Sequence, residues 1–599
     1  MHLRPLFFIL IFATTFPLAA QLGEEIVVTA SALPEKVAET PATVTVVTRE
    51  DIDDRAARDI ADVLREVPGL HVSRTGSSGR ATSLFTRGSN SNHTLVLWNG
   101  LEITNPYFAG YDWGRFSTVG VEQVEVVRGP YSALYGSEAM AGVVNVLTAS
   151  RRSGFRALAE AGGHGLRNAN ASVTWAGSSV NVSGSLEKRD DDGFSANDDF
   201  SQTSASGSMR WNATPTFSVG LAARHTSYDL GIPRNLNGAG TAIIPSLQRR
   251  QDGTERQVSV PIEQKLGRFS YDLTVAESRR DDTFEDPEDA FGLVLITTES
   301  RTRRARLTTR TETSFGTIVG GGEYEHAEVD DVTNFGPNFT GGERTERSLF
   351  VEDRYGAGSF ELSAGLRWDD YETFGSELSP RLAVAWLAGS SKFRAAFGEA
   401  FRAPAVGELY FPFAGNPDLE AERSRSFEIG YDHASGFSAT AFHSDYEDLI
   451  VFDSATFIFQ NVGEAEAQGL ELALQRNITS DLRASLSYTF TDTEERTTGA
   501  QLLRRPRHAG SLFLGYRMGI VDTNLVVQHT GARADVLPVS PYSRTTVESH
   551  TVFDANVQVT LGRFIPYVRV ENLTGVEYEE VLGYESPGRR AVVGVRFGM

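Results

Sequence analysis

The chain has 599 residues, which is too long for one ordinary soluble core and indicates several domains or one very large architecture. It contains no cysteine, so disulfides and thiol chemistry are excluded. Its formal net charge of −22 argues against nucleic acid as a partner, because binding phosphates requires a basic face. An acidic solvated surface, or acidic loops that bind cations, would account for this charge.

The N-terminus has the pattern of a secretory signal. Arg4 precedes the apolar run LFFILIFA, and the small residues Leu18-Ala19-Ala20 come before Gln21. We therefore predict a signal peptide over residues 1–20. A membrane anchor is the alternative, but the run is shorter than the roughly 18 to 20 residues that span a bilayer. No later apolar run reaches that length.

A short segment of strand-forming residues, EEIVVTA, follows at Glu24 to Ala30. It lies in residues 21–39, at a chain end where segments are usually loose unless something holds them. Two interpretations are open: an exposed strand that a partner adds to its own sheet, or a strand permanently paired inside the fold. We favour the exposed strand.

Residues 40–150 are predicted to form a small mixed α/β domain. Ala42 to Val47 is strand-like, and Thr48 with Asp51 has the T-x-x-D pattern of a helix start. Apolar residues from Ile52 to Val67 then fall at helical spacing, until Pro68-Gly69 ends the pattern. Further strands are expected at Thr94 to Leu97, Val121 to Val127 and Val143 to Leu147.

From residue 151 to 599 helical periodicity is replaced by alternation. In the segment from Phe360 to Asp369 apolar and polar residues alternate strictly, and a glycine-rich turn at 356–358 precedes it. This alternation is typical of a transmembrane barrel strand. A soluble sandwich would also alternate but does not need so long a run, and a solenoid would show a fixed repeat. At about 20 residues per strand the region holds about 22 antiparallel strands, whose wide lumen would need a plug. We assign that role to residues 40–150.

Several motifs, in order along the chain, resemble those of the TonB-dependent outer-membrane receptors. FTRGSNSNHTLVLWNG and VEQVEVVRGPYSALYGSEAMAGVVNVLT resemble plug motifs, and FRAPAVGELY and VENLTGVEYEEVLGYESPGRR resemble barrel motifs. EEIVVTA resembles the TonB box of that family, which comprises here Glu24, Glu25, Ile26, Val27, Val28, Thr29 and Ala30. The resemblance implies active uptake of a scarce nutrient by a monomeric barrel in contact with outer-membrane lipids. The partner would be TonB, energised by the proton gradient of the inner membrane.

Within that family the chain most resembles the cobalamin transporters, through the second plug motif, LLRRP at Leu502 to Pro506, and the closing PGR. This resemblance implies ligand contacts from Ser83, Asn90, Phe108, Ala109 and Arg504. Phe108 is read equally well as a packing residue. A ferric siderophore, haem or another metal chelate is the alternative cargo, because siderophore receptors share many of the same sequence motifs.

Two further sets of residues carry implied roles. Arg87 and Arg128 would contact carboxylates of the barrel wall and hold the plug; ordinary solvated arginines are the alternative. The acidic stretch KRDDDGFSANDDF would bind structural Ca²⁺ through Asp190 and Asp192, together with Tyr228 and Asp229. That pattern is incomplete, and a hydrophilic loop tip is the other interpretation.

Other classes of function fit less well. H-E-x-x-H, G-x-S-x-G and phosphate-loop motifs are absent from the sequence, so we do not expect an enzyme or a required cofactor. A passive porin needs neither a plug nor a TonB box, and a structural or adhesive barrel would have no use for them.

Overall fold

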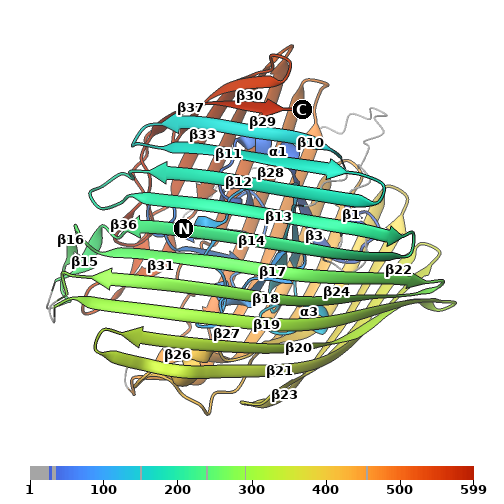
Figure 1. Cartoon of the computed structure of the whole chain (residues 1–599), viewed down its shortest axis with the longest axis horizontal. Coiled ribbons are helices and arrows are strands. Elements are labelled where there is room, and N and C mark those ends of the chain that lie inside the picture. Colours follow the sequence, from blue (N-terminus) through green and yellow to red (C-terminus); the bar gives the residue numbers. More distant parts are fainter. Residues whose placement is uncertain are drawn as a thin grey trace, which may run out of the picture.

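The computed structural model describes residues 26–27, 29, 35–148, 152–237, 240–289, 292–453 and 456–599. A closed barrel of 22 antiparallel strands dominates it (Figure 1), which confirms the predicted fold class. In ring order the strands are β10 (Gly154–Gly162), β11 (Arg167–Ala176), β12 (Val180–Asp191), β13 (Phe200–Thr214), β14 (Phe217–Gly231), β17 (Arg250–Leu266), β18 (Phe269–Asp286), β19 (Val294–Thr313), β20 (Gly316–Thr333), β21 (Gly336–Ala357), β22 (Phe360–Tyr371), β23 (Gly375–Ala388), β24 (Ser391–Arg402), β25 (Glu422–His433), β26 (Phe437–Asp453), β27 (Ile458–Asn477), β28 (Leu482–Glu495), β29 (His508–Met518), β30 (Val521–Thr530), β33 (His550–Val559), β34 (Phe564–Glu571) and β37 (Arg590–Gly598).

The predicted alternation is clear on β22. Phe360, Leu366 and Trp368 are exposed on the outer face, whereas Arg367 and Asp369 are buried on the inner face. The barrel closes where β10 pairs with β37, from Arg156 opposite Gly598 to Gly162 opposite Val592. Among the described residues, no helix is both long enough and apolar enough to cross a bilayer.

The two ends of the barrel differ, and this difference gives its orientation. The first strand begins and the last strand ends at the same rim, where the connections are short turns such as Gly358-Ser359. Longer loops at the other rim carry α4 (Val406–Tyr410) and the short pairs β15 (Arg234–Leu236) with β16 (Ile243–Pro245), β31 (Arg533–Val536) with β32 (Arg544–Val547), and β35 (Glu579–Val581) with β36 (Tyr584–Glu585). Short turns face the periplasm in such barrels and long loops face outward.

The wall is uneven in height. Strands β17 to β21 have between 17 and 22 residues, whereas β29, β30, β33, β34 and β37 have between 8 and 11. Figure 1 shows the long strands as the broad green face. The barrel is therefore tall on one side.

The plug lies within this ring and is built on a five-stranded sheet of order β3-β8-β9-β6-β7. Its elements are β3 (Thr43–Thr48), α1 (Arg49–Arg55), α2 (Ile60–Leu64), β4 (Leu70–Arg74), β5 (Thr82–Thr86), the 3₁₀ turn Ser91–His93, β6 (Thr94–Trp98), β7 (Leu101–Glu102), the 3₁₀ turn Trp113–Arg115, β8 (Gln123–Arg128), α3 (Ser132–Tyr135) and β9 (Gly142–Leu147). A short pair, β1 (Ile26–Val27) with β2 (Glu35–Lys36), precedes them.

The predicted single helix from Ile52 to Val67 is wrong, because the structure has two helices. Thr48 caps α1 through the predicted capping box with Asp51. The helix ends at Ala56, whose left-handed φ of 49° stops it. Asp59 then caps α2 in a second box with Asp62. The D-x-x-D spacing was visible in the sequence, but continuous apolar periodicity concealed it.

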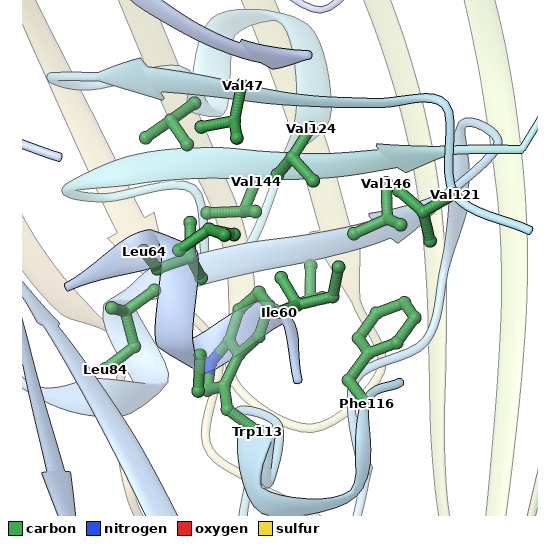
Figure 2. Packing of buried hydrophobic residues seen from close by; sticks show 14 of the residues in the cluster. Val47, Ile60, Leu64, Leu84, Trp113, Phe116, Val121, Val124, Val144 and Val146 are labelled. Atoms are coloured by element: carbon green, nitrogen blue, oxygen red, sulfur yellow. The ribbon is translucent and has the colours of Figure 1, made fainter. Parts of the chain in front are cut away.

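The plug has a hydrophobic core of its own. Figure 2 shows Val124, Val144 and Val146 of the sheet facing Ile60 and Leu64 of α2, with the rings of Trp113 and Phe116 beneath. Burial of this many large side chains accounts for a folded unit inside the lumen.

Candidate coupling and ligand sites

Arg87 joins the plug to the wall. It follows β5 at a positive φ of 52°, and its side chain is only 4% exposed. Its guanidinium lies 2.5 Å from Glu428 of β25 and 2.6 Å from Glu471 of β27. Burial by itself would lower the pKa of Arg87, but the two carboxylates outweigh it and raise that pKa. Arg87 is thus a fixed cation between two wall strands.

Arg128 lies beside this pair. It donates to the carbonyl of Pro68 and to Thr45 Oγ1 at 2.9 Å, and its Nε lies 3.6 Å from Glu471. Arg87 and Arg128 therefore meet on one wall carboxylate, although most of the bonds of Arg128 stay within the plug.

The same cluster reaches the first strand of the plug. The second oxygen of Glu428 accepts a hydrogen bond of 2.7 Å from Thr43 Oγ1, and Arg394 of β24 also donates to that hydroxyl. The loop after β5 and the start of β3 thus share Glu428.

The outward face of the plug meets the loop between β28 and β29 at Asn90. Arg505 of this loop donates to the Asn90 side chain at 2.6 Å and to the carbonyl of Ser89 at 2.9 Å, and its guanidinium lies 4.2 Å from the ring centre of Phe85. No carboxylate pairs with Arg505 in the described part of the chain. Burial, reinforced by Arg504, lowers the pKa of Arg505 to about 9. The guanidinium of Arg505 is therefore a buried cation whose hydrogen-bond acceptors are neutral oxygens.

A group of aromatic rings lies on the same outward face. We define the aromatic cluster as Tyr107, Phe108, Phe339 and Phe411, with ring centres 4.2 Å apart for Tyr107–Phe108, 6.0 Å for Tyr107–Phe339 and 6.4 Å for Phe108–Phe411. Phe108 is 43% exposed, and Phe413, two residues beyond Phe411, is 98% exposed. Aromatic rings that are exposed to solvent form a surface on which a ligand can stack.

Backbone hydrogen bonds fix this cluster. Val406 N donates to Pro106 O at 3.0 Å and Gly407 N to Tyr107 O at 2.7 Å, so α4 is attached to the plug loop. A Cβ placed on Gly110 would lie 3.2 Å from Asn92 Cα, which places this loop against the one that carries Asn90. The aromatic cluster and Asn90 therefore belong to one outward-facing floor.

The structure places the residues implied by the cobalamin resemblance unequally. Asn90 and Phe108 lie on this floor, and Ala109, at a φ of 60°, presents backbone. Ser83 is half-buried in β5 opposite Ser73. Arg504 turns to Asp535 of the neighbouring loop, 3.1 Å away. Its neighbour Arg505 contacts the plug instead, and neither Arg505 nor Phe411 had been singled out from the sequence.

The four residues proposed for calcium do not form one site. Asp190 pairs with Lys188 at 3.2 Å, Asp229 pairs with Arg250, and the Tyr228 hydroxyl donates to Asp282. The described residues contain no cluster of acids or histidines suited to a metal ion. In this structure Asp190, Tyr228 and Asp229 bond to other partners, and the Ca²⁺ site stays a prediction.

Other aspartates of the same stretch hold the plug. Ser78 donates to Asp191 at 2.7 Å, and Arg80 pairs with Asp198 at 2.7 Å. The acid-rich loop therefore anchors the plug loop over residues 75–81.

The described residues of the N-terminal segment, Ile26, Val27 and Thr29, are docked rather than free, which differs from the expected exposed strand. Ile26–Val27 pairs antiparallel with Glu35–Lys36. Thr29 is 1% exposed; its amide donates to Glu125 at 2.9 Å, its hydroxyl donates to the same oxygen, and it accepts from Asn145 at 3.0 Å. Residues Glu24, Glu25, Val28 and Ala30 lie outside the described residues, as does the predicted signal peptide.

A barrel of this size filled by a hydrogen-bonded plug defines a gated outer-membrane transporter. Residues 36–143 match the TonB-dependent receptor plug domain, and residues 163–574 match the TonB-dependent receptor-like β-barrel. The chain therefore belongs to the TonB-dependent receptor family, whose members are outer-membrane transporters.

Solved structures agree in fold. The ferripyoverdine receptor of Pseudomonas aeruginosa superposes with a TM-score of 0.82 at 15% identity, covering 96% of this chain and 89% of that one. The ferric enterobactin receptor of the same organism gives 0.77 at 18%, covering 94% and 100%. A siderophore receptor of Acinetobacter baumannii gives 0.77 at 18%, covering 96% and 100%. At these identities the likeness concerns the fold alone.

Proposed function

We propose that this transporter takes up a ferric siderophore with aromatic iron-binding groups, rather than cobalamin. The observation that carries the proposal is the solvent-open aromatic cluster, built from the plug and from the loop that bears α4. Catecholate or phenolate rings of a chelate would stack on Phe108 and Phe411 with their faces offset.

The remaining contacts support the same choice. Of the residues that the cobalamin interpretation requires, Ser83 is half-buried on β5 and Arg504 pairs with Asp535. The structural neighbours quoted above are siderophore receptors, which is compatible with the proposal. Cobalamin presents amides and a corrin edge, for which the exposed rings provide few hydrogen bonds.

Energy for uptake would come from TonB acting on the segment Glu24 to Ala30. Plug and wall share buried ion pairs at Glu428 and Glu471, so passive diffusion through the lumen would have to break them. This supports coupled transport over a passive porin.

Equilibrium binding to the purified protein would test the substrate. We expect ferric enterobactin, a tricatecholate, to bind with submicromolar affinity, and cobalamin to show no binding at micromolar concentration. Binding of cobalamin without binding of ferric enterobactin would contradict the proposal. Binding of ferric pyoverdine, a chelate of different architecture, is measured for comparison.

A further inference from the structure

The plug is held unevenly at its periplasmic half. The side of the wall formed by β21 to β25 holds it through charged groups: Arg354 pairs with Glu35, Lys392 donates to Val37 O at 2.9 Å, and Glu428 accepts from Thr43. Arg381 adds a hydrogen bond of 2.9 Å to the Tyr131 hydroxyl. Separating the plug here would leave buried charges without partners, which is costly.

The wall formed by β12, β13, β14 and β17 has a different inner surface. On β12 and β13, most inward-facing residues on the periplasmic side of the buried Glu187 are small and hydroxyl-bearing. We define the serine wall as Ser183, Ser185, Ser204, Ser206, Ser208, Ser218 and Ser259.

These hydroxyls satisfy one another. Ser183 bonds Ser208 at 2.7 Å and Ser185 bonds Ser206 at 2.8 Å across the β12–β13 pair. Among the described residues no hydrogen bond or ion pair joins the serine wall to the plug. Moving the plug away from this surface therefore leaves no wall hydroxyl of these pairs without a partner.

Within the described residues, the plug surface that faces the serine wall lies close to it without a bond to the wall serines. Ser117, Val119 and Val121 of the plug line a cavity of about 20 Å³ together with Ser185 and Ser206. The turn at Gly120, with a φ of 69°, comes so close that a Cβ there would lie 2.9 Å from Ser185 Cβ. The wall serines on β12 and the facing part of β13 are half-buried, whereas Glu428 is almost wholly buried.

We propose that the plug separates from the serine wall during uptake and that the cargo crosses between this wall and residues 117–121, while the contacts to β21–β25 hold. Within the described part of this seam the wall serines give no bond to the plug, and the polar contacts that must open lie at its outer edge, where Glu187 contacts Ser117 and Arg189 pairs with Asp59 at 2.7 Å. A path lined by serines also suits a polar, hydrated chelate. The inference rests on the coupled uptake proposed above.

Two engineered disulfides test the path, since the chain has no cysteine to interfere. Gly120→Cys with Ser185→Cys locks the seam. Ala133→Cys with Gly365→Cys locks α3 to β22, where a Cβ on Gly365 would lie 3.5 Å from Ala133 Cβ, within the range of a disulfide. Single-cysteine variants and addition of reductant control for strain at Gly120.

Uptake of ⁵⁵Fe-labelled ferric enterobactin by cells is the first measurement. We expect the oxidised seam lock to reduce uptake at least tenfold, with recovery on reduction, and the α3 lock to retain at least half of the parental rate. Uptake that persists through the oxidised seam lock, or that is lost equally with both locks, would overturn the proposed path.

A second measurement does not depend on the cargo. Purified protein in planar bilayers is exposed to urea on the periplasmic side, and KCl conductance reports plug displacement. The seam lock should suppress the conductance increase and the α3 lock should not; the reverse pattern would refute the path. If the parent fails to take up ferric enterobactin, the proposed substrate is wrong and conductance still decides the path.

Discussion

Thr29 donates both its amide and its hydroxyl to one oxygen of Glu125, a carboxylate buried on β8 of the plug sheet. A third bond, from Asn145 of β9 at 3.0 Å, fixes the hydroxyl of Thr29 from the other side. Thr29, which lies in the segment that resembles a TonB box, is therefore attached to β8 and β9 of the plug sheet in this state.

Removing the hydroxyl should release this segment. We expect Thr29→Val to cost about 1 to 3 kcal/mol of docking free energy, because buried polar partners lose their bonds, which corresponds to a shift of roughly 5- to 150-fold toward the undocked state. Mobility of a spin label at Val27→Cys measures the shift.

Thr48→Val is the matched control, because it removes a helix cap of the same residue type without touching Thr29. A spin label that is equally mobile in Thr29→Val and Thr48→Val, or whose mobility is unchanged by Thr29→Val, would show that the bonds of Thr29 do not hold the segment.

The ion pairs of Arg87 should hold the plug closed. Arg87→Met leaves Glu428 and Glu471 without their shared cation, and the expected loss of plug stability is about 3 to 5 kcal/mol. Urea titration of the bilayer conductance reports it.

Adding Glu471→Met to Arg87→Met should recover part of that loss, since one unpaired charge is removed with its partner. Two outcomes would show that these pairs do not hold the plug. One is a stability loss in the double variant equal to the sum of the two single losses, and the other is an Arg87→Met variant as stable as the parent.

Arg505 should lower the stability of the protein while contributing to chelate binding. We expect Arg505→Met to leave stability unchanged or to raise it by up to about 2 kcal/mol, because a buried cation without a counterion is removed. The same variant should weaken chelate binding, since Asn90 and the loop after β5 lose their anchor.

The pH dependence follows from the folded-state pKa of Arg505, which burial lowers to about 9, well below that of an exposed arginine. Below pH 9 the folded protein bears the full cost of the buried charge. As the pH rises above 9 the folded state loses that proton first, so the advantage of Arg505→Met should shrink. Thermal denaturation of both proteins at pH 7 and pH 10 measures this; an advantage that grows with pH would contradict the assignment.

The aromatic cluster should carry ligand affinity. Phe108→Ala and Phe411→Ala should each weaken binding of ferric enterobactin by about 10- to 100-fold, since each removes a stacking surface worth about 1 to 3 kcal/mol. Phe315→Ala is the matched control, because that exposed ring lies at a periplasmic turn. Equal effects at Phe108 and Phe315 would exclude the cluster as a ligand site.

The barrel, the plug and their order along the chain could be predicted, because alternation along a strand such as β22 and helical periodicity in α1 and α2 are local patterns. The break at Ala56 was missed because a helix end set by one left-handed residue leaves apolar spacing intact. The alternation in residues 360–369 could be predicted without knowing which strands pair with them.

The site was predicted less completely, because its contacts join residues far apart in sequence. The motif LLRRP drew attention to the correct loop, yet only the structure shows that Arg505 meets Asn90 while Arg504 turns to Asp535. The acid-rich stretch likewise indicated a functional loop, but its aspartates bind Ser78 and Arg80 of the plug. The resemblance to cobalamin transporters could not show which residue each side chain bonds to in the fold.

Deletion of residues 24–30 is the most direct test of TonB-coupled uptake. With ⁵⁵Fe-labelled ferric enterobactin, binding to the cell surface should be unchanged, because the proposed ligand floor is formed by Phe108 and Asn90 and not by this segment. Uptake should be abolished. Uptake that continues at the parental rate after the deletion would contradict coupling through this segment.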